Sequence, residues 1–250
     1  MKNRAYKNYI FDFYGTLVDI LTDEKDPVLW DKLCQLYQAY GAAYEGETLK
    51  KAYAKRVDQA RKELIELKGV AYPEIDLAHI FNQLYVDARP QSSNSNQPED
   101  WGQLIAMVFR VLSRKHVTAY PHTKEVLAFL KEQGCRIYLL SNAQAAFTNA
   151  EIDLMALRPY FDAIYLSSDA GICKPHPEFL KQVLDNHGLN PSETVMVGND
   201  LTTDIAVAEA VGIDGILLNT FPYSPRELEN SPIKPDRVIT DIEALKTNFT

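Results

Sequence analysis

Short apolar runs alternate with helix-like segments from residue 117 onward, and this alternation constrains the fold more than any other feature. Uninterrupted β-branched or aliphatic runs are typical of strands buried on both faces of a parallel sheet. The segments between them have helical spacing and end in glycine, a common helix stop. The runs are CRIYLLSNA (135–143), FDAIYLSSD (161–169), ETVMVGND (193–200), IDGILLNT (213–220) and DRVITD (236–241). With YIFDF (9–13) as a further strand, they predict a Rossmann-like α/β core.

Residues 20 to about 116 show helical periodicity almost throughout. Four segments carry it, at 27–41, 46–69, 75–88 and 100–115, and a polar loop, RPQSSNSNQPED, precedes the last. A helical block placed after the first strand of an α/β core predicts an inserted all-helical cap domain, 19–116. The core domain would then comprise residues 1–18 and 117–250, and the connections near 18–24 and 114–121 would be hinges.

Charge and cysteine usage narrow the class of partner and the compartment. The net charge of −8 argues against nucleic acid or an anionic membrane as a partner, since both are normally met by clustered Lys and Arg. Cys34, Cys135 and Cys173 lack metal-ligand spacing and suit free thiols. We find neither a signal-peptide pattern nor an apolar run near the roughly 20 residues that span a bilayer. We expect a cytoplasmic protein, either a monomer or a homodimer.

Polar residues gather where the predicted strands end. Ligands of open α/β sheets bind beyond the carboxyl ends of the strands, so we expect these residues to share one site. They are Asp12 and Thr16, then Ser141 and Asn142, then Lys174, and finally Asn199, Asp200 and Asp204. Each alone could merely cap a turn or helix. Their order along the chain is much more specific.

That order resembles the four motifs of the haloacid dehalogenase superfamily of hydrolases. The opening Asp-x-Asp-Gly-Thr motif of the family corresponds to DFYGT, and the Ser or Thr that closes the second strand corresponds to Ser141. The family lysine, usually followed by proline, corresponds to Lys174 in KPHPEF. The Gly-Asp-x(3 or 4)-Asp motif corresponds to GNDLTTD. The resemblance covers the chain outside the helical insert.

The resemblance implies that Asp12 is a nucleophile that forms a covalent aspartyl intermediate, which water then hydrolyses. A carboxylate is a weak nucleophile and needs a positive field, which Lys174 can supply. Ser141 would hydrogen-bond a phosphoryl oxygen. Backbone N–H groups of the turn after Asp12, including Gly15, can bind oxyanions, and we place Thr16 and Asn142 with them as substrate-binding residues.

The resemblance also implies a Mg²⁺ site formed by Asp12, the carbonyl of Tyr14, Asp204 and either Asn199 or Asp200. Without a cation, converging carboxylates would repel one another and neutralise the nucleophile. Asn199 stands where the family places its first acid and Asp200 follows one residue late, so both remain candidates.

Tyr14 departs from the phosphatases of the family, which carry a second Asp here to protonate the leaving alkoxide. A phenol is a poor general acid at neutral pH, whereas haloacid dehalogenases have Tyr at this position and release a halide that needs no proton. We therefore predict a Mg²⁺-dependent phosphatase acting on a small anionic metabolite. Two alternatives stay open: a 2-haloacid dehalogenase that uses Asp12, and a non-catalytic phosphate-binding homologue.

Overall fold

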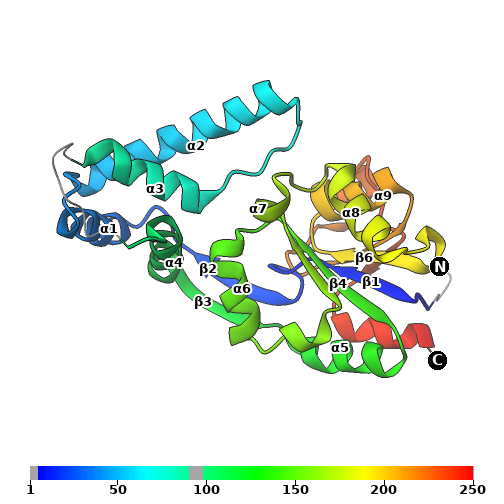
Figure 1. Cartoon of the computed structure of the whole chain (residues 1–250). Helices are drawn as coiled ribbons and strands as arrows, with labels where there is room; N and C mark the ends of the chain where they lie inside the picture. Colours follow the sequence, from blue (N-terminus) through cyan, green and yellow to red (C-terminus); the bar gives the residue numbers. More distant parts are fainter. Residues whose placement is uncertain (1–4, 90–97, 250) are drawn as a thin grey trace.

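The computed structural model describes residues 5–89 and 98–249 (Figure 1). A sheet of six parallel strands forms its centre, in the order β5-β4-β1-β6-β7-β8. The strands are β1 (Asn8–Phe11), β4 (Arg136–Ser141), β5 (Ala163–Leu166), β6 (Thr194–Gly198), β7 (Asp214–Leu218) and β8 (Arg237–Ile239). The predicted Rossmann-like α/β core is confirmed. Because the chain crosses from one side of β1 to the other, the carboxyl ends of β1, β4 and β6 meet at a topological switch point.

Alternate residues of the central strands pack into two apolar layers, one on each face of the sheet. Tyr9 and Phe11 of β1 face one layer, whereas Ile10 faces the other. The helices of the first layer include α5 (Thr123–Glu132), α6 (Ala145–Leu154) and the 3-10 segment Ile242–Phe249. The second layer is covered by α8 (Pro177–His187) and α9 (Ala206–Val211). Both faces are covered, so the central strands β1, β4, β6 and β7 are almost fully buried, as predicted. The edge strands β5 and β8 are partly exposed, so the prediction of burial on both faces is wrong for them.

The inserted region contains the four predicted helices, which pack around an aromatic-rich cluster of their own. They are α1 (Pro27–Ala39), α2 (Gly46–Lys68), α3 (Leu77–Ala88) and α4 (Trp101–Ser113). Most of the predicted polar loop, residues 90–97, lies outside the described residues. Figure 1 shows these helices grouped to one side of the sheet. The domain boundaries at 18/19 and 116/117 stay predictions.

The two connections to the inserted region are strands, which the sequence did not indicate. β2 (Val18–Thr22) and β3 (Arg114–Ala119) pair antiparallel, with Val18 opposite Ala119. Both strands are partly exposed, so they lack the continuous apolar run that marks the strands of the main sheet. Strand pairing therefore holds the start and the end of the insertion together.

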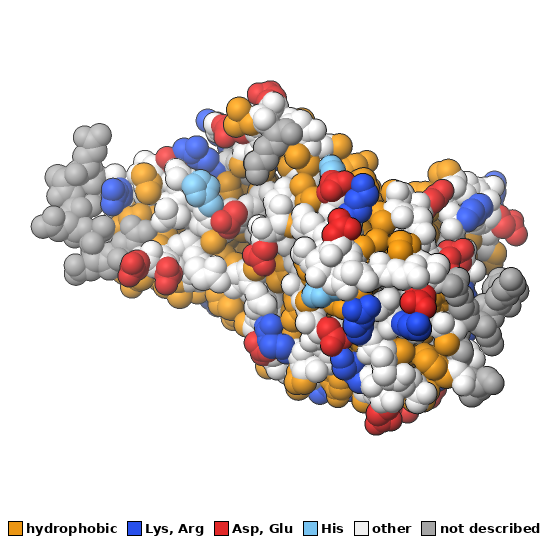
Figure 2. All heavy atoms as spheres, turned by 45° about the vertical axis from the view of Figure 1, so that its right-hand side comes forward, with side chains coloured by type: hydrophobic (Ala, Val, Ile, Leu, Met, Phe, Trp, Pro, Cys, Tyr) orange, Lys and Arg blue, Asp and Glu red, His pale blue; other side chains and the backbone are white. Residues whose placement is uncertain are grey.

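The remaining short elements connect the main ones. They are the helix α7 (Ser167–Ala170), the 3-10 turns Arg158–Tyr160 and Pro191–Glu193, the π-helical turn Leu201–Ile205 and the helix α10 (Pro225–Asn230). Acidic and basic side chains are intermixed on the face shown in Figure 2. Over the described ranges, no helix combines the length and apolar character needed to cross a bilayer.

Candidate active site

A pocket of about 190 Å³ lies at the carboxyl ends of β1, β4 and β6. Most of its lining residues were predicted from the sequence as one group. They are Asp12, Tyr14, Ser141, Asn142, Lys174, Asn199, Asp200, Thr203 and Asp204. The fold therefore brings together residues that are far apart in the sequence, from Asp12 to Asp204.

Lys174 lies at the centre of this site with only 1% of its side chain exposed. Its Nζ donates to Asp12 Oδ1, Asp204 Oδ1 and the carbonyl oxygen of Leu140, each at 2.7 Å. Burial by itself lowers the pKa of Lys174, but the two carboxylates outweigh burial and raise it above the usual value. The protonated ammonium thus separates two carboxylates that would otherwise repel each other.

Asp12 has one oxygen held firmly and the other held weakly. Oδ1 accepts hydrogen bonds from Lys174 and, at 3.0 Å, from Ser141 Oγ. Within the part of the chain that the structure describes, Oδ2 accepts only one hydrogen bond, a long one of 3.3 Å from Thr16 Oγ1. The Thr16 hydroxyl also lies 3.2 Å from Asn199 Oδ1. A carboxylate fixed through one oxygen is oriented for attack with the other.

Asp204 is buried, and both of its carboxylate oxygens are engaged within the protein. Oδ1 accepts from Lys174, and Oδ2 accepts from the backbone N–H of Asp200 at 3.0 Å. Burial raises the pKa of Asp204 to about 6, although the ion pair with Lys174 opposes this shift. Through these contacts Asp204 orients Lys174.

Gly198, which the sequence analysis used only to align the motif, makes room for Asp204. A Cβ atom on Gly198 would lie 2.3 Å from Asp204 Cγ, far inside van der Waals contact. The Asp204 carboxylate, in the turn Leu201–Ile205, lies so close to the end of β6 that position 198 requires glycine.

We expect Gly198→Ala to lower the free energy of unfolding by about 1–3 kcal/mol, the usual cost of overpacking, and to impair activity by displacing Asp204. The matched control is Gly215→Ala in the neighbouring β7, where the nearest atom to the new Cβ would be Ile205 Cδ1 at 3.3 Å. Chemical denaturation of both variants measures the difference. Equal stability of the two would contradict the packing argument.

Two side chains secure the loops around Asp12 and Lys174. Asn142 Nδ2 donates to the carbonyl of Lys174 at 3.0 Å, and Asn142 Oδ1 accepts from the N–H of Lys174 at 2.8 Å. Thr220 Oγ1 donates to the carbonyl oxygen of Gly15, whose φ of +80° suits glycine. The Asn142 side chain thus holds the loop that carries Lys174. Its predicted contact with substrate stays a prediction.

The oxygen atoms near Asp12 have the chemistry that Mg²⁺ prefers. Asp200 Oδ1 accepts from the N–H groups of Thr202 and Thr203, at 2.7 and 2.9 Å, and so caps the helical turn. Asn199 and Asp200 both line the pocket beside Asp12. In residues 5–89 and 98–249, no three His, Cys, Asp or Glu side chains are grouped to hold a metal. Mg²⁺ keeps several waters and needs only one or two carboxylates, so these residues fit it.

The side chain of Tyr14 is engaged by residues that the sequence analysis missed. Its hydroxyl donates to the Glu151 carboxylate and lies 3.1 Å from Thr148 Oγ1. Burial strongly raises the pKa of Tyr14. A signal was present in the sequence: Arg110, the partner of Glu151, falls on the otherwise largely apolar, buried stripe of α4.

The inserted region also contacts the loop that carries Lys174. The N–H of Cys173 donates to the carbonyl of Tyr72 at 2.8 Å, and the N–H of Glu74 donates to the carbonyl of Gly171 at 3.2 Å. Gln144, two residues after Asn142, donates to the carbonyl of Ile75 at 2.8 Å. The connection between α2 and α3 is therefore attached to two of the loops that form the site.

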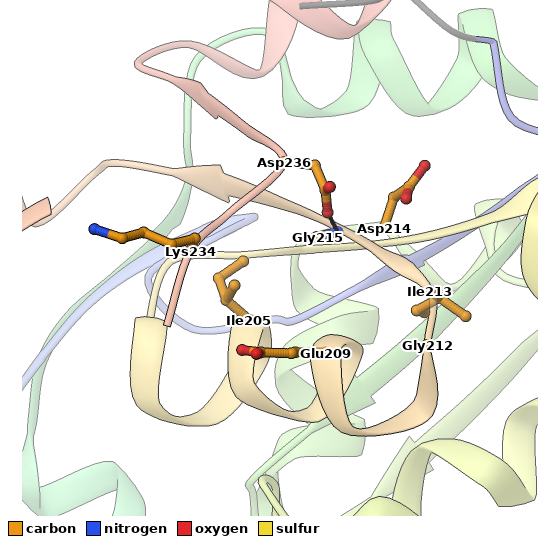
Figure 3. A pocket seen from close by; sticks show the side chains of 8 residues that line it. All are labelled: Ile205, Glu209, Gly212, Ile213, Asp214, Gly215, Lys234 and Asp236. Carbon is orange, nitrogen blue, oxygen red and sulfur yellow. Dashed lines mark hydrogen bonds between the residues drawn. The ribbon is translucent and has the colours of Figure 1, made fainter. Parts of the chain in front are cut away.

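A separate pocket of about 260 Å³ lies beside α9, β7 and the segment before β8 (Figure 3). Its charged side chains support the local fold: Asp214 accepts from the Tyr6 hydroxyl, Asp236 accepts from the N–H of Gly215, and Lys234 donates to the carbonyls of Leu228 and Glu229. None of the predicted site residues lines this pocket.

The fold and the first pocket define an α/β protein whose ligand site lies at the carboxyl ends of a parallel sheet. The family model described as haloacid dehalogenase-like hydrolase matches residues 6–212. The chain belongs to this family and is a hydrolase, so the resemblance inferred from the four motifs is confirmed.

Proteins with similar sequences include phosphatases. The chain is 32% identical over 130 residues to the ribulose-1,5-bisphosphate 5-phosphatase of Halopiger xanaduensis, covering 52% of each chain. It therefore spans about half the length of that relative. It is also similar to the glyceraldehyde 3-phosphate phosphatase of Methanocaldococcus jannaschii, with 27% identity over 186 residues, 68% of this chain and 81% of the relative.

Among solved structures, the 2-haloacid dehalogenase from Pseudomonas syringae pv. Tomato DC3000 is similar over 98% of each chain, with a TM-score of 0.67 and 19% identity. Likeness at this level of identity establishes the shared fold alone. The reaction has to be inferred from the residues of the site.

Proposed function

We propose that this hydrolase is a Mg²⁺-dependent phosphatase that acts on a small phosphorylated metabolite through an aspartyl-phosphate intermediate. The arrangement of Lys174 carries the proposal: its buried ammonium contacts Asp12 and Asp204 at 2.7 Å and leaves Asp12 Oδ2 with one long hydrogen bond. A fixed positive charge beside a carboxylate nucleophile suits attack on an anionic phosphoryl group. The phosphatase names among the relatives support the same reaction.

In the first step, Asp12 Oδ2 attacks phosphorus, a new O–P bond forms, and the bond from phosphorus to the ester oxygen breaks. The leaving oxygen takes the bonding electron pair and departs as an alcohol after it gains a proton from solvent. Lys174 and Ser141 hold Asp12 through Oδ1. In the second step, water attacks phosphorus, the bond between phosphorus and Asp12 Oδ2 breaks, and the attacking water loses a proton to solvent. Inorganic phosphate leaves, and Asp12 keeps the bonding electron pair as its carboxylate.

Asp12, the Tyr14 carbonyl and either Asn199 or Asp200 would hold Mg²⁺. Asp204 was also predicted as a ligand, and this stays a prediction, because both of its oxygens accept hydrogen bonds from Lys174 and the N–H of Asp200. When bound, the ion neutralises the negative charge of the phosphoryl oxygens and so allows a carboxylate to approach them. The ammonium of Lys174 would neutralise the remaining negative charge of the phosphoryl oxygens, and Asp204 holds Lys174 in position.

Tyr14 shapes the substrate preference in this proposal. The Tyr14 hydroxyl donates its hydrogen bond to Glu151, and burial strongly raises the pKa of Tyr14. Tyr14 is therefore a poor proton donor for a leaving alkoxide. We therefore expect esters of acidic alcohols to react faster than simple alkyl phosphates.

A substrate panel with Mg²⁺ and with EDTA tests the proposal. It contains ribulose 1,5-bisphosphate, glyceraldehyde 3-phosphate, 4-nitrophenyl phosphate and a 2-haloacid, and it measures released phosphate and halide. We expect phosphate release with Mg²⁺, and its loss in EDTA followed by recovery when excess Mg²⁺ is added. Phosphate release that persists in EDTA would refute the metal dependence.

The second candidate is a 2-haloacid dehalogenase, which Tyr14 favours because a halide leaves without a proton. Asp12 would then attack carbon and displace halide. Halide release in the same panel, without phosphate release, would select this reaction. Binding of inorganic phosphate without turnover of any substrate would instead indicate a non-catalytic homologue.

A further inference from the structure

Glu151 is the centre of a buried charge network that the reaction steps above do not use. Only 3% of its side chain is exposed. Its carboxylate accepts from Arg110 Nε and Nη2 at 2.8 and 2.9 Å, from Arg114 Nη1 at 2.8 Å and from the Tyr14 hydroxyl. Burial alone would raise the pKa of Glu151, but Arg110 and Tyr14 keep it below the usual value. Glu151 is thus a fully engaged carboxylate.

The members of this network come from four separate parts of the fold. Glu151 lies on α6, which packs on the sheet, and Arg110 lies near the end of α4, the last helix of the inserted region. Arg114 begins β3, one of the two connecting strands. Tyr14 follows Asp12 by two residues. In Figure 1, α4, α6 and β3 lie together where the helical region meets the sheet.

Arg110 also stacks against the aromatic rings beside it. Its Cζ lies 5.0 Å from the centroid of the Tyr14 ring and 4.7 Å from that of Phe147. The bidentate ion pair with Glu151 fixes the plane of the Arg110 guanidinium, and the contacts with the two rings restrain it further. Tyr14 is therefore held by its hydroxyl through Glu151 and by its ring through Arg110.

A buried ion pair is seldom retained for stability, because desolvation of the charges offsets their attraction. It does specify one geometry, since each partner must sit where its hydrogen bonds are satisfied. Here the specified geometry includes the turn Asp12–Thr16, whose backbone and hydroxyl groups surround the nucleophile.

We propose that Glu151 is a positioning residue for this reaction: by holding the Tyr14 hydroxyl it sets the turn after Asp12, and through Arg110 it ties that turn to the inserted helical region. The kinetic part of this inference rests on the proposed phosphatase activity. The structural part, that Glu151 restrains residues 12–18 through Tyr14, does not.

The test compares Tyr14→Phe, Glu151→Gln and the double variant. Tyr14→Phe keeps the ring that stacks on Arg110 and removes only the hydroxyl. Asp153→Asn is the matched control, because Asp153 lies on the same helix, pairs with Arg158 and is exposed. Steady-state kinetics with 4-nitrophenyl phosphate and Mg²⁺ give kcat and KM, and hydrogen exchange measures opening of amides 12–18 in each full-length variant.

We expect each single variant to lower kcat about tenfold with KM changed less than about twofold, the pattern of a misplaced reacting group. The double variant should be no slower than the slower single variant, because both remove the same link. Amides 12–18 should exchange faster in all three variants and remain unchanged in Asp153→Asn.

If the kcat of the double variant fell by the product of the two single-variant factors, the proposal would be overturned. It would also be overturned if kcat stayed unchanged and only the thermal stability fell. The two readouts separate its failure from failure of the proposed function. If the wild-type protein hydrolyses no ester, the exchange rates alone decide: faster exchange at 12–18 in Tyr14→Phe and Glu151→Gln supports the link, and wild-type exchange rates refute it.

Discussion

We expect Asp12→Asn to lower the rate of ester hydrolysis by more than about a thousandfold, because the amide has no anionic oxygen with which to attack phosphorus. The folded protein should persist, since Asn can still accept from Ser141 and Lys174 through its carbonyl oxygen. Rates with 4-nitrophenyl phosphate and Mg²⁺ measure the effect, and circular dichroism checks the fold.

Asp19→Asn is the control for this variant. Asp19 lies on β2, shortly after the turn that follows Asp12, and makes an exposed contact with His116. Its replacement should leave the rate within about twofold of wild type, because exposed ion pairs contribute little. A folded Asp12→Asn variant that keeps a tenth or more of the wild-type rate would rule out nucleophilic attack by Asp12.

Lys174→Met has the second-largest effect, and it acts on stability as well as rate. It removes the ammonium between two buried carboxylates, which leaves Asp12 and Asp204 facing each other unpaired. Breaking a buried ion pair from one side typically costs about 3–5 kcal/mol of unfolding free energy. We expect activity to fall by more than about a thousandfold, as for other groups that act directly on the reacting atoms.

The pH dependence of the Lys174→Met variant supplies a further check. Loss of Lys174 removes the interaction that opposes the burial effect, so the pKa of Asp204 rises further above its value in the unfolded chain. A carboxyl whose folded pKa is raised binds a proton more readily when folded, so the variant should gain stability as pH falls through that pKa.

Denaturation of Lys174→Met between pH 5 and pH 8 measures this slope, with Lys181→Met as the control for an exposed lysine that pairs with Glu178. Adding Asp204→Asn to Lys174→Met should recover part of the lost stability and none of the activity. If Lys174→Met were as stable as Lys181→Met at every pH, Lys174 would not be what holds the two carboxylates together.

Sequence patterns predicted the main sheet because its central strands are buried on both faces. Residues such as Ile10 and Phe11 face opposite apolar layers, so the strand reads as one apolar run. The site followed from the same pattern, since parallel strands end at one edge. Contacts between distant segments were not predictable in this way. β2 and β3 carry polar residues and are partly exposed, and only tertiary packing joins Arg110 to Glu151.

Tyr14 illustrates the limit most clearly. Tyr14 stands where the family resemblance implies a general acid, yet its partner Glu151 lies 137 positions away on a helix with no motif. Gly198 could be aligned with the family motif, but its physical purpose, space for Asp204, depends on a turn geometry that only the folded chain provides.

The most direct measurement is acid quenching of the enzyme during turnover of 4-nitrophenyl phosphate with Mg²⁺, followed by mass analysis of its peptides. We predict one phosphoryl group on Asp12, removed by hydroxylamine as an acyl phosphate requires, and none in the Asp12→Asn variant. Turnover without phosphoryl transfer to Asp12, or a phosphoryl group on a different residue, would contradict the assignment of Asp12 as the nucleophile.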